Sequence, residues 1–166
     1  MNRVIRYKGI LHNVLNDAPF IGAIIIANGC NMPCKECINE HLKRDEYLIY
    51  NKTDEILEEV KQNGLNEGII LSGLEWTEQP DALVSLVEAA LADNLKVMVY
   101  THHMEFDFFN IVPELRHKPI HVKFGLYDLS LKDDNYFSHT VKLATTNQYI
   151  MFYGDEMADI DTIKTR

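Results

Sequence analysis

All three cysteines of the 166-residue chain lie within eight positions, at Cys30, Cys34 and Cys37. The spacing C-x3-C-x2-C on a tight loop lets three thiolates point at a common centre. Soft thiolates favour Fe–S clusters, zinc or cuprous copper. A cubane Fe–S cluster usually takes four cysteines, so three would leave one iron open. An open iron can bind a substrate or cofactor directly.

Two other uses of the same thiols stay open. His41 follows Cys37 by four positions, so a structural Cys3His zinc site can form. Free cysteines can also pack as small hydrophobic side chains. The cysteines follow a buried strand in an α/β pattern rather than a small metal-stapled module, which favours the cluster over zinc. Packing of free thiols ranks last, because chance would not gather every thiol here.

The elements that must position this loop alternate between strand and helix. Thr53 is expected to cap the first helix and Gly64 to end it. Such an alternation predicts right-handed crossovers and a mostly parallel sheet. The pattern predicts strands over 20–28, 68–71, 96–100, 121–127 and 148–153, helices over 53–64 and 80–94, and short helix and loop over 105–116.

The loops after four of these strands carry polar or reactive residues. The cysteine loop follows the first strand, "SGLEW" (72–76) the second, "THH" (101–103) the third and "GLYD" (125–128) the fourth. Sites in parallel sheets form at the carboxyl ends of strands, so we expect the four loops to converge. His102 and His103 are adjacent, and adjacent side chains on an extended chain point opposite ways. Both histidines are therefore not expected to serve one centre.

Composition indicates one domain over 1–166, with a core of about 16–153 and a polar C-terminal tail. Hydrophobic residues make up 46% of the chain and charged residues 25%, and the net charge is -9. This charge argues against nucleic acid as a partner. No apolar run is long enough for a membrane span or a signal peptide. Clustered cysteines without distant mates do not suggest disulfides, so we expect a cytoplasmic protein.

The cysteine spacing after the first strand of an α/β chain resembles the signature of the radical SAM enzymes. The resemblance implies that Cys30, Cys34 and Cys37 hold a [4Fe–4S] cluster, and that S-adenosylmethionine (SAM) chelates the fourth iron through its amino and carboxylate groups. In that family the reduced cluster cleaves SAM to methionine and a 5′-deoxyadenosyl radical. The chain is shorter than a closed eight-fold barrel requires. We therefore expect an α/β fold that is a partial, open (β/α) barrel with a mostly parallel sheet.

Further stretches, over about 16–150, resemble the activating proteins of anaerobic ribonucleotide reductase. "CxxCIN", with Asn39, is similar to their "CxxCHN", and "FGLYD" (124–128) to their "DGPY/F". "KLATTNQYI" is similar to "RGSSNQRI", with Asn147 and Gln148 at matching positions. The resemblance implies a large glycyl-radical enzyme as protein substrate and an electron donor such as flavodoxin or ferredoxin. It implies no catalytic residue beyond the cluster and SAM.

The same resemblance implies further SAM contacts. "SGLEW" stands where the family has "SGGEP", which holds the methionyl amino group, and it departs from that motif at Leu74. If the second position needs φ > 0, Leu74 costs about 1 kcal/mol or more, and otherwise it would crowd the cofactor. Because of such departures, action on another peptide or small molecule stays open, as does a non-enzymatic Cys3His zinc-binding interaction domain. The implied cofactor-binding residues are Glu36, Asn39, Ser72, Gly73, Leu74, Glu75 and Thr101.

Overall fold

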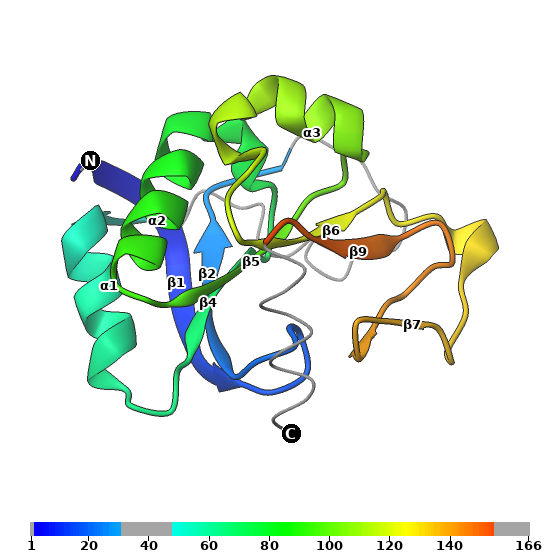
Figure 1. The fold of residues 1–166 in the computed structure, drawn as a ribbon, viewed down its shortest axis with the longest axis horizontal. Helices are drawn as coiled ribbons and strands as arrows, with labels where there is room; N and C mark the ends of the chain where they lie inside the picture. Colours follow the sequence, from blue (N-terminus) through cyan, green and yellow to red (C-terminus); the bar gives the residue numbers. More distant parts are fainter. Residues whose placement is uncertain (1, 31–47, 155–166) are drawn as a thin grey trace.

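The computed structural model describes residues 2–30 and 48–154, and their main element is a seven-stranded sheet (Figure 1). Its strands are β1 Val4–Val14, β2 Gly22–Ala27, β3 Ile49–Lys52, β4 Gly68–Ser72, β5 Lys96–Tyr100, β6 His121–Phe124 and β9 Tyr149–Phe152. The helices are α1 Thr53–Gln62, α2 Pro80–Ala92 and α3 Glu105–Ile111, with 3-10 turns η2 Trp76–Glu78, η3 Pro113–Leu115 and η4 Leu129–Leu131. A separate two-stranded hairpin consists of β7 Phe137–Ser138 and β8 Val141–Lys142.

The strand order β3-β1-β2-β4-β5-β6-β9 defines a mixed sheet with a parallel centre. β2, β4, β5 and β6 pair in parallel, whereas β1, β3 and β9 join antiparallel at the sides. The expected α/β class is therefore confirmed, and the parallel arrangement holds for the central strands. The described strands form an open sheet with β3 and β9 at its edges, and in this part of the chain they do not close into a barrel.

Both faces of the central strands are buried, which explains the uninterrupted apolar runs in β2 and β4. α1 and α2 lie side by side and, with α3, cover one face (Figure 1). The opposite face is covered by the loop after β1 and by the hairpin segment. The buried apolar side chains on this face form a second hydrophobic cluster, separate from the one beneath the helices. Its members are Ala18, Phe20, Ile24, Ile70, Met98, Val141, Leu143 and Ile150. In the described part, no helix is long and apolar enough to cross a membrane.

Thr53 does not cap α1, contrary to the sequence-based expectation. Lys52 occupies the N-cap position without a side-chain hydrogen bond. Thr53 lies one residue further in and is buried, and its hydroxyl lies 2.8 Å from the Ser85 hydroxyl on α2. The helix ends at Gln62, and Asn63 rather than Gly64 occupies the C-cap position. A hydroxyl that looked like a local cap therefore joins two helices instead.

Candidate functional site

The carboxyl ends of β2, β4, β5 and β6 bring the four predicted loops together. The Glu75 N–H, after β4, donates to the Gly29 carbonyl after β2 at 3.0 Å. The Gly125 N–H, after β6, donates to the His103 carbonyl after β5, also at 3.0 Å. Backbone hydrogen bonds therefore join the loop after β4 to the loop after β2, and the loop after β6 to the loop after β5. The side chain of Glu75 links these two pairs of loops, because it accepts the His102 N–H after β5.

Glu75 is the centre of this cluster, with a relative exposure of only 3%. Its Oε1 accepts the His102 N–H at 2.8 Å and the Thr101 hydroxyl at 3.2 Å. Its Oε2 accepts the N–H and the hydroxyl of Thr77, at 3.1 and 2.7 Å. These four donors match the acceptor capacity of an ionised carboxylate. Glu75 thus positions the loop after β5, and its contact with SAM stays a prediction.

The turn after β4 requires glycine at Gly73. Its φ is +87°, and a Cβ there would lie 2.7 Å from Cγ2 of Ile26 on β2. The backbone of Leu74 is not in the left-handed region. Leu74 is only 9% exposed and packs in the hydrophobic core between the sheet and the three helices, called here the helix-side core. The replacement of the family's second glycine therefore introduces no left-handed strain. Ser72, at the end of β4, is also buried.

Two positioning residues of this turn were not indicated by the sequence motifs. Trp76 is fully buried, and its Nε1 donates to the Ile25 carbonyl at 3.0 Å. The side chain of Gln79 accepts the Asn28 N–H at 3.0 Å and donates to the Arg6 carbonyl at 2.8 Å. The start of α2 thereby fixes the chain just before the cysteines. The chain's single tryptophan, directly after the glutamate, was the available signal.

Cys30 lies at the carboxyl end of β2, half-buried against the helix-side core. Its soft thiol, on a loop tied to the Gly73–Glu75 turn, suits a ligand of an Fe–S cluster. Within the described ranges, no three His, Cys, Asp or Glu side chains are close enough to hold a metal ion. The remaining candidates in the cysteine loop lie outside the described residues: Cys34, Glu36, Cys37, Asn39 and His41.

The two histidines after β5 lie against each other, with ring centroids 4.1 Å apart. The expectation that they diverge is wrong, because β5 ends at Tyr100 and the chain bends at both residues. The Nε2 of His102 is 3.6 Å from Oε1 of Glu75. Desolvation by burial lowers the pKa of His102, although the Glu75 carboxylate opposes the shift. The His102 ring is therefore mostly neutral near neutral pH.

A buried lysine belongs to the same end of the sheet. Lys123 on β6 is 7% exposed, and its ammonium donates to the Gly125 carbonyl at 3.0 Å. It also lies 5.6 Å from the centroid of the Tyr100 ring, within the range of a cation–π contact. A lysine inside the apolar strand "HVKF" was the sequence signal that could have indicated it. The site thus contains a buried cation as well as a buried carboxylate.

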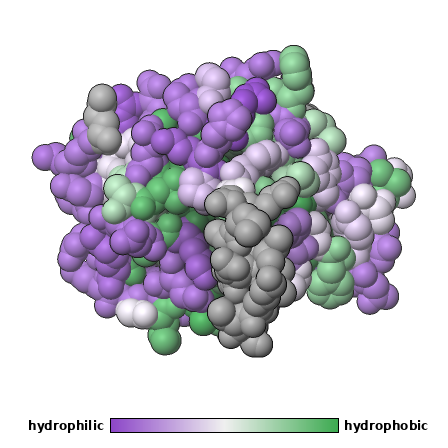
Figure 2. All heavy atoms as spheres, in the orientation of Figure 1, coloured by the Kyte–Doolittle hydropathy of each residue, from purple (hydrophilic) through white to green (hydrophobic). Residues whose placement is uncertain are grey.

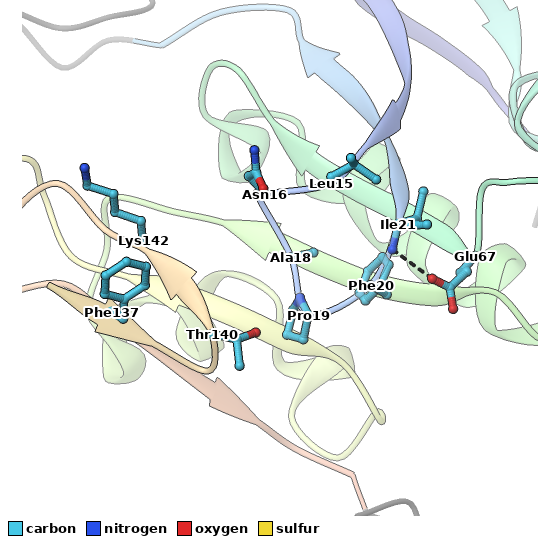
Figure 3. A pocket seen from close by; sticks show the side chains of 10 residues that line it. All are labelled: Leu15, Asn16, Ala18, Pro19, Phe20, Ile21, Glu67, Phe137, Thr140 and Lys142. Carbon is cyan, nitrogen blue, oxygen red and sulfur yellow. Dashed lines mark hydrogen bonds between the residues drawn. The ribbon is translucent and has the colours of Figure 1, made fainter. Parts of the chain in front are cut away.

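Two cavities lie at opposite ends of the sheet. One, of about 590 Å³, adjoins His102 and the loop after β6. The other, of about 580 Å³, lies at the amino ends of β2 and β4, between the 15–21 loop and the β7–β8 hairpin (Figure 3). There Glu67 accepts the Ile21 N–H at 2.9 Å. The first cavity is the one that adjoins the candidate site, because His102, whose N–H donates to Glu75, lines it.

Fold and site together define an α/β protein whose cysteine loop and glycine–glutamate turn meet at the carboxyl ends of parallel strands. A family model described as a 4Fe-4S single cluster domain matches residues 21–135, well over half of the chain. The protein therefore belongs to the 4Fe-4S single cluster domain family. This membership confirms the predicted iron–sulfur class. A search of curated proteins gave no match.

Proposed function

We propose that this protein is a radical SAM enzyme that generates a glycyl radical on a partner such as anaerobic ribonucleotide reductase. The observation that supports the proposal most is the junction of the cysteine loop with the Ser72–Glu75 turn through the Glu75–Gly29 bond. Membership of the 4Fe-4S single cluster domain family supports the proposal that the protein binds an iron–sulfur cluster. The proposed binding of SAM is supported by the resemblance of "SGLEW" (72–76) to the "SGGEP" motif of the radical SAM enzymes.

Cys30, Cys34 and Cys37 would hold the cluster, and Ser72, Gly73 and Thr101 would contact SAM. When bound and reduced by a donor such as flavodoxin or ferredoxin, the cluster would supply one electron to SAM, which would split into methionine and a 5′-deoxyadenosyl radical that could take a hydrogen atom from a partner glycine. The Glu75 carboxylate is already saturated by protein donors. Its role would be to keep the Thr101 hydroxyl in place.

The activating-enzyme subtype is supported by the surroundings of Asn147 and Gln148. Asn147 Nδ2 donates to the Leu126 carbonyl at 2.7 Å, and Gln148 Nε2 donates to the Gly125 carbonyl at 3.2 Å. The segment that resembles the activating proteins is thus attached to the loop after β6, beside the candidate site. A partner polypeptide bound near this segment would lie next to the proposed SAM site.

The test is anaerobic iron–sulfur reconstitution followed by an assay for 5′-deoxyadenosine with SAM and dithionite. The wild-type protein is expected to bind iron and sulfide and to form deoxyadenosine, and Cys30→Ala to lose both properties. A colourless protein that holds one zinc, loses it in His41→Ala and forms no deoxyadenosine would contradict the proposal. Radical formation on a glycyl-radical reductase, followed by EPR, tests the subtype separately.

A further inference from the structure

A cationic patch lies on the side of the sheet that β1 and β3 form. Val4 pairs with Lys52 and Arg6 with Tyr50 across the two antiparallel strands, so these four side chains share one face of the sheet. The intervening Ile5 is buried on the opposite face, in the helix-side core. Val4, Arg6, Tyr50 and Lys52 are all exposed, and they are called here the β1–β3 patch.

The sign of its charge distinguishes the patch from the rest of the molecule. The chain has 25 acidic and 16 basic residues and a net charge of -9, yet the sequences of β1 and β3 contain no Asp or Glu. Most of the face drawn in Figure 2 is hydrophilic, so polarity alone would not single out this region. Arg3 pairs with Asp81 at 3.4 Å, whereas no carboxylate of the described residues lies within ion-pair distance of Arg6 or Lys52. Both charges are therefore available to an anionic partner.

The patch adjoins the loop that carries the cysteines. β1 runs antiparallel to β2, so its first residues lie beside the carboxyl end of β2. Gln79 joins the two segments, because its side chain donates to the Arg6 carbonyl at 2.8 Å and accepts the Asn28 N–H at 3.0 Å. Asn28 is two positions before Cys30, a proposed cluster ligand. A protein bound at the patch would therefore lie next to the proposed cluster.

The strand order separates the patch from the proposed SAM contacts. The cysteine loop follows β2, and the patch lies to one side of it, on β1 and β3. The turn at 72–75 and Thr101 lie to the other side, after β4 and β5. The partner glycine must reach the side where SAM would bind, whereas an electron can enter the cluster from the β1 side. The position therefore favours an electron donor over the glycyl-radical partner as the protein bound here.

We propose that an acidic one-electron carrier protein docks on the β1–β3 patch and reduces the cluster from there. Arg6 and Lys52 contact its carboxylates, and Val4 and Tyr50 supply apolar contact. One electron passes from the reduced carrier to the cluster, so the carrier leaves oxidised by one electron and no atom is transferred. The assignment rests on the proposed function for the presence of a redox cluster, while the charge and the place of the patch come from the structure.

The test uses the full chain after anaerobic reconstitution and two acidic carriers, a bacterial flavodoxin and a plant-type ferredoxin. Titration calorimetry is expected to show binding at about 20 mM NaCl that weakens about tenfold at about 200 mM, because salt screens the charges. Arg6→Glu combined with Lys52→Glu should weaken binding at the lower salt about tenfold or more, because two attractions become repulsions. Lys132→Glu combined with Lys142→Glu is the matched control, since it makes the same change in net charge at exposed positions outside the patch.

Stopped-flow absorbance measures electron transfer separately from binding. Reduction of the cluster by reduced flavodoxin should slow about tenfold in the doubly reversed variant. Deoxyadenosine formation with dithionite should match the wild type, because a small reductant needs no docking surface. The milder pair Arg6→Gln and Lys52→Gln should give a smaller loss of binding, and it decides the question if the reversed variant fails to fold.

Carrier binding at wild-type strength by both patch variants would overturn the assignment, as would an equal loss in the control or no binding of either carrier to the wild type. A patch variant that loses affinity for a glycyl-radical reductase or for duplex DNA, but not for the carriers, would overturn it as well. Absence of deoxyadenosine formation by the wild type with dithionite would instead refute the proposed function, and the carrier titrations would still decide the assignment.

Discussion

At the scale of single residues, Glu75 and Gly73 hold together the turn after β4 and the loops beside it. Glu75 is predicted from the sequence to contact the cofactor, and in the structure its carboxylate accepts from Thr77 in its own turn and from Thr101 and His102 in the loop after β5. Gly73 looked like half of a glycine pair, and it alone carries the positive φ of the turn. Both residues are needed to join β4 to β2 and β5 at the carboxyl ends.

Glu75→Gln is expected to destabilise the fold by about 1–3 kcal/mol. The amide NH2 of glutamine cannot accept, so it would face donors that a carboxylate oxygen satisfies. Urea unfolding measures the loss, and Glu114→Gln, at an exposed position, is the control. Iron content after reconstitution should stay at the wild-type level, because Glu75 is not a proposed ligand. A variant as stable as the wild type would show that the four bonds contribute little.

Gly73→Ala is expected to destabilise by about 2 kcal/mol or more. An alanine would adopt a left-handed conformation, and its Cβ would press against Ile26. Gly64→Ala is the matched control, because nothing lies within 4 Å of a Cβ there. Chemical unfolding of both variants measures the difference. Equal stabilities would mean that the turn adjusts without strain.

At the scale of elements, the sequence predicted the central strands, whose side chains are buried on both faces of the sheet. The strands at 22–27, 68–72 and 96–100 are apolar on both faces, so their composition alone indicated them. β1 was missed because it is a side strand with polar residues between its apolar ones, and β7 and β8 are two residues each. The convergence of the loops was predictable from parallel topology, whereas the hydrogen bonds of Trp76 and Gln79 join residues distant in sequence.

The β7–β8 hairpin offers a prediction at this scale. Its turn residues, His139 and Thr140, have φ values of 48° and 66°, and neither is glycine or asparagine. A β-branched residue in this region is strained, whereas glycine adopts it freely. Thr140→Gly is therefore expected to stabilise the protein by about 0.5–1 kcal/mol, the strain relieved less the added entropy of the unfolded chain.

The urea midpoint measures this gain. Thr146→Gly, at an exposed turn position without positive φ, should instead lower the midpoint slightly. If Thr140→Gly also lowers the midpoint, the threonine makes contacts that outweigh its strain.

At the scale of the whole molecule, both faces of the central sheet are filled with apolar side chains. Polar groups that need water or a ligand are therefore directed to the ends of the strands. The carboxyl end holds the buried Glu75 and Lys123 and the cavity that Asn147 lines, and the amino end holds the other cavity, which loop and hairpin residues line. A sheet that is buried on both faces thus places the candidate site at the carboxyl ends of its central strands.

The same packing makes global stability depend on pH through His121, at the start of β6. Its ring lies 4.5 Å from that of Phe152 and 6.5 Å from that of Phe20, centroid to centroid. Burial, and to a lesser degree the nearby His139 and Lys96, lower its pKa to about 4. The folded protein therefore holds His121 neutral, whereas the unfolded chain would protonate it near pH 6.5.

Because the folded-state pKa is the lower one, the stabilising effect of neutral His121 is complete above about pH 6.5 and is lost as pH falls toward 4. The loss is on the order of 2 kcal/mol, allowing for partial solvent screening. Urea unfolding between pH 4 and 7 measures it, and His121→Phe should flatten the profile over this window because the ring no longer titrates. His117→Phe serves as the matched control, because His117 lies at an exposed position and should leave the slope unchanged. A profile with the same slope in His121→Phe and wild type would place the acid sensitivity elsewhere in the fold.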